Sequence, residues 1–290
     1  MILHLIYNHI LYTTMIYYKT DEQIELLREN CLLVSKVLTH IAGKIRPGLT
    51  GAQLDKEAEE LIRDHGAVPG FKGLYGCPST LLISINEQVV HGLPSTDPFK
   101  DGDIVSIDCG TLKHEYYGDA AYTFALGNIS EEVMALLQTT KEALYRGIEQ
   151  AKAGNRVGDI SHAVQSYCEK THNYGVVREL VGHGVGKKLH EKPNVPNFGK
   201  RGKGVVMKPG LVIAIEPMIN MGRKEVKQLS DGWTIVTKDG KPSAHYEHTV
   251  AVRKEGADIL SDHKIIEAAI SKNKDLQEVI AREPINALLG

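Results

Sequence analysis

The sequence predicts an α+β fold made of two related halves. A helix–helix–strands pattern occurs twice, with matching positions roughly 110 residues apart. The sharpest match is between residues 100–108 (KDGDIVSID) and 208–216 (KPGLVIAIE), because each apolar run ends in a carboxylate. Two such halves would bury their sheets together, and the cleft between them is a usual place for a site.

The first half begins with two helices. Thr20 opens a Thr-x-x-Gln capping box, and apolar residues then alternate in steps of three and four up to Ile41, which is one face of a helix. A Pro-Gly pair at 47–48 ends this helix. Thr50 opens a second box and Gly66 closes the second helix. Strand-like runs follow at residues 81–85, 88–91, 103–109 and 116–126.

The second half repeats this order. Ser130 caps a helix that Gly154 breaks, and a second helix crosses residues 160–167. Strand-like runs follow at residues 176–181, 210–216, 234–238 and 245–252. Residues 254–290 resemble a C-terminal tail with a short helix near 265–270, and we assign no chemistry to them.

Composition excludes several classes of protein. The chain has 290 residues, of which 42% are hydrophobic and 24% charged, so it is neither disordered, collagen-like nor a disulfide scaffold. A net charge of −2 gives no global attraction to nucleic acid or to an anionic membrane. The four cysteines are far apart, which indicates free thiols in a reducing compartment and excludes a zinc finger.

The N-terminal extension, residues 1–19, needs a separate interpretation. Its first 18 residues contain no Asp, Glu, Lys or Arg, and they approach the length of a membrane span. Polar residues interrupt the run, and neither a basic segment nor a cleavage site marks a signal peptide. We expect a segment packed on the body or a start placed too early, with Met15 as the initiator; a membrane anchor is the alternative.

Four carboxylates carry the strongest chemical signal. Asp108 and Glu216 end apolar strands, while Asp119 and Glu247 lie within the strands that follow. An ionised carboxylate in such a place is costly unless it is paired or binds a metal. Four converging carboxylates would take up protons unless cations neutralise them, and two divalent ions would balance them.

Three histidines accompany these carboxylates. His183 and His190 lie in a glycine-rich stretch where backbone can approach a site closely, and His91 occupies a similar strand-to-loop position in the first half. Each histidine alone would more often be a core or surface residue. Their coincidence with glycine-flanked strand ends makes them candidate site residues.

These motifs together resemble the type I methionine aminopeptidases of the M24 metallopeptidase family. The resemblance runs from about residue 19 to residue 252 and is carried by NEQVVHGLP (86–94), GDIVSID (102–108), GD (118–119), GHGVG…HE (182–191), IEPM (215–218) and YEHT (246–249). It implies the pita-bread fold, with two pseudo-symmetric halves and a catalytic domain over residues 20–253.

The resemblance also implies a dinuclear metal centre. It assigns two divalent ions (Co, Mn, Fe or Zn) to Asp108, Asp119, His183, Glu216 and Glu247, with Asp119 and Glu247 bridging. The implied reaction is removal of the N-terminal methionine from nascent proteins whose second residue is small, by a water that the two metals activate. Glu216 would be the general base, His190 would stabilise the oxyanion, and His91 would bind the amide beyond the scissile bond.

The resemblance places an apolar slot around the first side chain of the substrate. Its members are Phe71, Leu74, Cys77, Leu82, Leu189 and Trp233. Such a slot suits an unbranched thioether. Leu74 and Cys77 stand where tyrosines are expected in some relatives, so selectivity for methionine follows less directly than the metal site, and ordinary core packing is the alternative for all six.

Other interpretations of the same residues stay open. Proline-specific aminopeptidases and dipeptidases share the five ligands, but they usually carry a large N-terminal domain. Type II enzymes carry a helical insertion where only a short stretch separates His190 from Glu216. A non-catalytic binding protein of this fold would be expected to lose ligands, and a mononuclear metal module leaves Asp119 and Glu247 unexplained. We expect a cytoplasmic monomer that meets its substrates near the ribosome exit, with no nucleic-acid or membrane partner.

Overall fold

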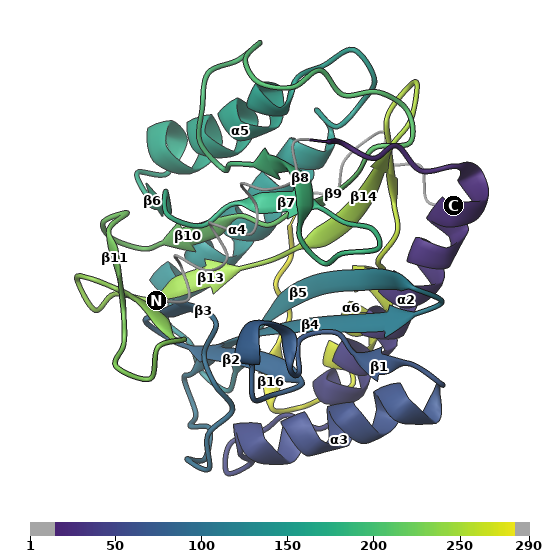
Figure 1. Cartoon of the computed structure of the whole chain (residues 1–290). Helices are drawn as coiled ribbons and strands as arrows, with labels where there is room; N and C mark the ends of the chain where they lie inside the picture. Colours follow the sequence, from purple (N-terminus) through teal and green to yellow (C-terminus); the bar gives the residue numbers. More distant parts are fainter. Residues whose placement is uncertain (1–14, 282–290) are drawn as a thin grey trace.

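Residues 15–281 are described by the computed structural model, and the N-terminal run discussed above lies largely outside them. In the first half, two helices precede a sheet (Figure 1). These elements are α2 (Asp21–Ala42), α3 (Gly51–Asp64), β1 (Val68–Pro69), the short helix η1 (Leu74–Gly76), β2 (Leu81–Ile85), β3 (Gln88–Val90), β4 (Ile104–Lys113) and β5 (Tyr116–Leu126).

The second half again places two helices before its strands. It contains α4 (Glu131–Ile148), α5 (Val157–Gln165), the π-helical turn η2 (Ser166–Thr171), β6 (Gly175–Val176), β7 (Gly182–Gly184), β8 (Glu191–Val195), β9 (Val212–Ile215), β10 (Met218–Asn220), β11 (Val226–Gln228), β12 (Ile235–Thr237), β13 (Ser243–His245) and β14 (His248–Val252). β15 (Ala257–Ile259), α6 (His263–Ile270) and β16 (Leu276–Gln277) complete the described chain.

The predicted helix starts agree with the structure. Thr20 and Thr50 form complete capping boxes, and the Ser130 hydroxyl accepts from the Val133 amide. α2 ends at Ala42, before the Pro-Gly pair that was expected to stop it. The helix predicted over residues 160–167 begins earlier, at Val157, because Asp159 accepts a hydrogen bond from the Arg156 amide at its start.

Each half has a sheet at its centre. β2, β4 and β5 pair antiparallel in the first half, and β16 joins the free edge of β5. In the second half, the order is β15-β14-β9-β7-β8. Figure 1 shows α2 and α3 beside the first sheet and α4 and α5 beside the second. β15 extends the second sheet, β16 extends the first, and α6 packs against α2, so residues 257–277 are part of the body.

A seam of hydrogen bonds joins the two halves. Residues 245–249 run alongside β5: the Glu247 amide donates to the Ala121 carbonyl (3.0 Å), and the Thr249 hydroxyl donates to the Asp119 carbonyl (2.8 Å). The prediction of one continuous strand over residues 245–252 is wrong. The chain leaves β13 at His245 and enters β14 at His248, and the residues between the two strands bond to β5.

One further predicted strand is too long. Residues 176–181 were expected to form a strand, but pairing stops at Val176, apart from the bond from the Val177 amide to the Met218 carbonyl (3.2 Å). Residues 178–181 leave the sheet and line a cavity between the halves. Their backbone therefore contributes to the site instead of to a ladder.

Candidate active site

Asp108 and Asp119 come from neighbouring strands of the first half. In the β4–β5 pair, Asp119 lies opposite Gly110, and Asp108 lies opposite Ala121. Successive residues alternate between faces, so two carboxylates offset by two residues project from the same face of the sheet. The predicted antiparallel pairing of these two strands is confirmed.

The second half supplies His183, Glu216 and Glu247. His183 lies in β7, Glu216 directly follows β9, and Glu247 directly precedes β14. The Nδ1 atom of His183 contacts the Gly184 carbonyl oxygen at 3.0 Å. A carbonyl only accepts, so Nδ1 carries the proton and Nε2 presents its lone pair to the cavity, which is the arrangement of a metal-binding imidazole.

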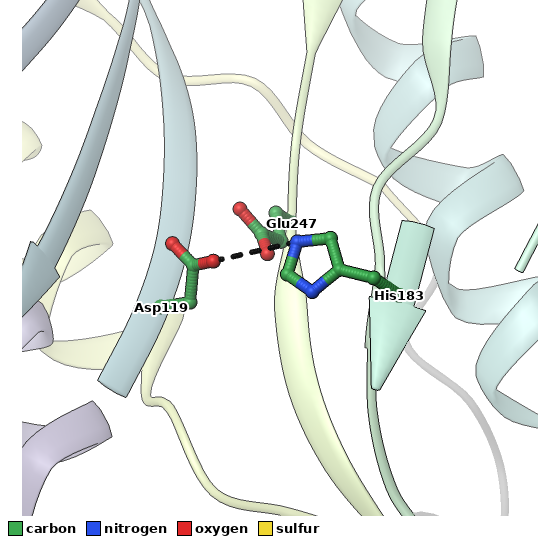
Figure 2. Close-up of side chains that lie close together, drawn as sticks. All are labelled: Asp119, His183 and Glu247. Carbon is green, nitrogen blue, oxygen red and sulfur yellow. Dashed lines mark ion pairs between the residues drawn. The ribbon is translucent and has the colours of Figure 1, made fainter. Parts of the chain in front are cut away.

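Three of these side chains form one buried cluster (Figure 2). Asp119, His183 and Glu247 each offer a ligand atom, and these atoms lie within 4.8 Å of one another. His183 Nε2 lies 3.7 Å from Asp119 Oδ2 and 3.4 Å from Glu216 Oε1. Asp108 and Glu216 line the same cavity, so all five predicted ligands meet there.

The electrostatics of the cluster favour a bound cation. Burial raises the pKa of Asp108 to about 7, and burial together with neighbouring carboxylates raises the pKa of Asp119, Glu216 and Glu247 well above the ordinary range. One oxygen each of Asp108, Asp119 and Glu247 is buried without a hydrogen-bond partner. Such oxygens are costly unless something positive occupies the space between them, so the donor set fits hard or borderline divalent ions.

His91 and His190 lie in the same cavity as the five carboxylate and imidazole groups. Burial lowers the pKa of His91 to about 4, and burial with neighbouring histidines lowers the pKa of His190 further, so both rings are neutral near pH 7. His190 packs edge-on against His183 at 4.4 Å between ring centroids, and its Nδ1 is buried without a partner. His91 has a φ of +60°, an uncommon conformation for a non-glycine residue.

The six predicted slot residues form an apolar wall of this cavity. Phe71, Cys77, Leu82 and Leu189 form one buried cluster, and Leu74 and Trp233 pack against it. All six line the cavity of about 260 Å³ that also holds the five carboxylate and imidazole groups. Anionic side chains and an apolar cluster therefore line one cavity.

Several residues at or beside the site escaped prediction from the sequence. His245 lies with its Nε2 3.7 Å from Glu216 Oε2, and burial lowers its pKa to about 3. The sequence feature that could have indicated a role for His245 is its position two residues before the predicted ligand Glu247. Tyr75 stacks on His190 at 5.8 Å between ring centroids. It directly follows Leu74, one of the two positions where some relatives are expected to carry tyrosine. Arg178 lines the cavity, where its guanidinium lies over Phe198 and pairs with Glu169.

Comparison with known proteins gives the family. Residues 25–254 match the model of metallopeptidase family M24. The chain belongs to this family. Within M24 it is 51% identical to the methionine aminopeptidase of Clostridium perfringens over 247 residues, which cover 85% of this chain and 99% of that relative. It is 47% identical, with the same coverage, to methionine aminopeptidase 1 of Bacillus subtilis.

Solved M24 structures agree with the fold. The methionine aminopeptidase of Thermotoga maritima superposes with a TM-score of 0.84 at 41% identity, covering 86% of this M24 chain and all of the other. The prolidase of Pyrococcus furiosus shares the fold alone, at a TM-score of 0.69 and 24% identity. The predicted family and the predicted pita-bread fold, with its two related halves, are confirmed. The chain is a methionine aminopeptidase of the type I, bacterial-like kind by this relationship.

Proposed function

We propose that this chain removes the N-terminal methionine from polypeptides whose second residue is small, using two divalent ions. The observation that supports this most is the cluster of Asp119, His183 and Glu247, with Asp108 and Glu216 in the same cavity. Anionic side chains and an apolar cluster line that cavity together. A free peptide terminus with an unbranched apolar side chain matches both kinds of lining.

The five side chains divide between two ions in this proposal. Asp119 and Glu247 would serve both ions, Asp108 would complete the ligand set of one, and His183 with Glu216 would complete that of the other. When bound, such a pair supplies Lewis acidity and makes a water nucleophilic near neutral pH. Oxygen-rich ligation with one imidazole suits Mn, Fe, Co or Zn and does not choose among them.

Glu216 moves the proton in this proposal. Its carboxylate lies between His183 (3.4 Å) and His245 (3.7 Å), and burial and the charge of Asp108 raise its pKa well above the usual value. A carboxylate in this place can accept a proton from water and release it to the leaving amine. Glu216 is thus the general base of the proposed reaction.

The two cavity histidines bind the reacting peptide. Both are neutral near pH 7, so each has one ring N–H to donate. His190 donates to the carbonyl oxygen as negative charge develops on it, which is the largest single contribution in many hydrolases. His91 holds the amide beyond the scissile bond. The apolar cluster around Phe71 and Leu189 receives the methionine side chain.

A peptide panel tests this function. The purified chain is supplied in turn with Mn, Fe, Co or Zn and incubated with Met-Ala-Ser and with Ala-Pro peptides. We expect methionine to be released from the first peptide and no cleavage of the second. Cleavage of Ala-Pro peptides alone would favour a proline-specific peptidase of this fold, and cleavage of neither with any metal would favour a non-catalytic member.

The cellular setting belongs to the same proposal. We place the chain in the cytoplasm, as a monomer acting on nascent polypeptides near the ribosome exit. The four cysteines are free and buried, which suits a reducing compartment. Within residues 15–281, no helix has the length and apolar character needed to cross a membrane. Co-sedimentation with translating ribosomes and the mass in solution test these statements.

A further inference from the structure

A buried ion pair connects the start of the described chain to the catalytic loop. Lys19 Nζ lies 2.7 Å from Glu191 Oε2, and only 5% and 6% of the two side chains are exposed. The two residues are 172 positions apart in the chain. Glu191 begins β8 and directly follows His190 in the sequence.

The other carboxylate oxygen of Glu191 holds the turn before it. Glu191 Oε1 accepts from the Lys188 amide at 3.2 Å. Gly186 lies so close that an added Cβ would stand 2.3 Å from the same oxygen. The Glu191 carboxylate therefore fills the inside of the turn over residues 186–190, and Lys19 neutralises it.

This turn carries two of the proposed substrate-contacting residues. Leu189 belongs to the apolar wall, and His190 lines the cavity in which we place the reacting carbonyl. The Gly186 carbonyl accepts from the Tyr117 amide at 2.9 Å, two residues before Asp119. The position of the turn thus decides how Leu189 and His190 stand relative to the ligands on β5.

Lys19 is itself held against the second half. Its amide donates to the Gly210 carbonyl at 2.7 Å, and isolated bridges join Ile16 to Lys192 and Tyr18 to Leu211. The helix that begins two residues later, α2, packs on β4 and β5 of the first half. Lys19 therefore stands where the chain passes from one half to the other.

A buried ion pair is weak evidence for stability, because well-packed apolar side chains often stabilise a core as well or better. A buried ion pair does, however, fix the position of one charged group relative to the other. We infer that Lys19 and Glu191 form a positioning pair that fixes His190 and Leu189 for the reaction, so that the segment before α2 is part of the active site. This inference rests on the proposed function, since it concerns the loop that contacts the substrate.

The variants separate positioning from folding. Lys19→Met removes the cation, and Glu191→Gln keeps the shape of the side chain but removes its charge. The double variant, which carries both changes, has no ionised group at either position of the pair. Lys19→Arg restores the charge. Lys187→Met is the matched control, because Lys187 lies in the same turn and also pairs with a glutamate, Glu115, but these two side chains are 60% and 77% exposed.

We expect the double variant to fold and to bind metal as the unaltered chain does, with kcat for Met-Ala-Ser reduced by on the order of ten- to a hundredfold. Lys19→Arg should recover most of kcat, and Lys187→Met should keep it within twofold. In the metal-free protein, the imidazole NMR signal of His190, assigned by its loss in His190→Gln, should shift in Lys19→Met and stay in place in Lys187→Met.

An unchanged kcat in the folded double variant, or an unmoved His190 signal in Lys19→Met, would overturn the inference. Equal losses of kcat and metal binding would do so too, since they indicate a general structural role. If the Lys19 variants do not fold, Glu191→Gln decides by the same two measurements. Failure of the unaltered chain to cleave Met-Ala-Ser would reject the proposed function instead, while the NMR comparison would still test the pair.

Discussion

His183 and Asp119 come from different halves of the chain, and their side chains face one another with His183 Nε2 3.7 Å from Asp119 Oδ2 (Figure 2). Each is fixed by its own sheet: Asp119 lies opposite Gly110 in the β4–β5 pair, and His183 follows Gly182, which pairs with Val195 of β8. The candidate metal centre therefore exists only when both halves are packed together. Ligands that the folded chain already holds close together need little rearrangement to bind an ion.

Removal of a ligand from either half should abolish the centre. We expect His183→Ala or Asp108→Asn to lose binding of at least one ion and to reduce cleavage of Met-Ala-Ser by at least about 100-fold. Isothermal titration calorimetry with Mn or Co measures the first effect, and methionine release the second. His114→Ala is the control, because His114 lies in the β4–β5 turn with 53% of its side chain exposed. A variant that binds two ions normally would refute the ligand assignment.

Metal affinity should rise with pH through neutrality. Ligand carboxylates must be ionised to bind, and burial raises the pKa of Asp108 to about 7. Protons therefore compete with the metal below about pH 7, and affinity should fall by about tenfold per pH unit for each displaced proton. His183 contributes nothing to this slope between pH 6 and pH 8, because its pKa of about 4 leaves it neutral throughout.

Titrations at pH 6, 7 and 8, each in two buffers of different ionisation enthalpy, would measure both the affinity and the protons released. The proton release should be largest at pH 6 and decline towards pH 8. An affinity independent of pH over this range would show that the four carboxylates are already ionised in the metal-free protein, contrary to the directions of their pKa shifts.

Features that depend on residues close together in the chain, such as helix starts and hairpins, could be predicted from the sequence. Two capping boxes and the Ser130 N-cap predicted three helix starts, and the hairpin that joins Asp108 to Asp119 followed from two strands separated by a short polar turn. The repeat predicted that related strand ends would surround one site. The resemblance to a known family supplied the specific set of ligands, and all five lie in one cavity.

Contacts between distant segments could not be predicted in this way. The seam between β5 and residues 245–249 depends on the Thr123 hydroxyl, which donates to the His245 carbonyl at 2.6 Å, and no local pattern signals it. The same holds for Lys19 and Glu191, which pair although they are 172 positions apart in the chain. His245 was overlooked because a strand histidine is more often a core residue, and only its distance of 3.7 Å from Glu216 shows otherwise.

Loss of the His190 imidazole should slow the reaction without affecting metal binding. His190→Ala removes the proposed donor to the developing oxyanion, so we expect kcat for Met-Ala-Ser to fall on the order of 10²–10³-fold with a smaller change in KM. His190 lies outside the cluster of metal-ligating atoms, so calorimetric metal binding should be preserved. Loss of metal binding in this variant would instead make His190 a ligand. An unchanged kcat would remove it from the mechanism.

Selectivity for methionine should depend on Phe71. Its ring covers Gly110, where an added Cβ would stand 2.5 Å from it, so the ring is fixed between β4 and the cavity. Phe71→Ala should enlarge the slot, lower kcat/KM for Met-Ala-Ser, and narrow the preference for methionine over alanine at the first position.

Phe99→Ala is the matched control: it removes an equally buried ring from the main core, away from the cavity. Each change should cost about 3–5 kcal/mol of stability, so chemical denaturation of both variants sets their stabilities on one scale. If Phe99→Ala altered the preference for methionine as much as Phe71→Ala, the change would result from lost stability. The apolar cluster would then be ordinary core packing and not a substrate slot.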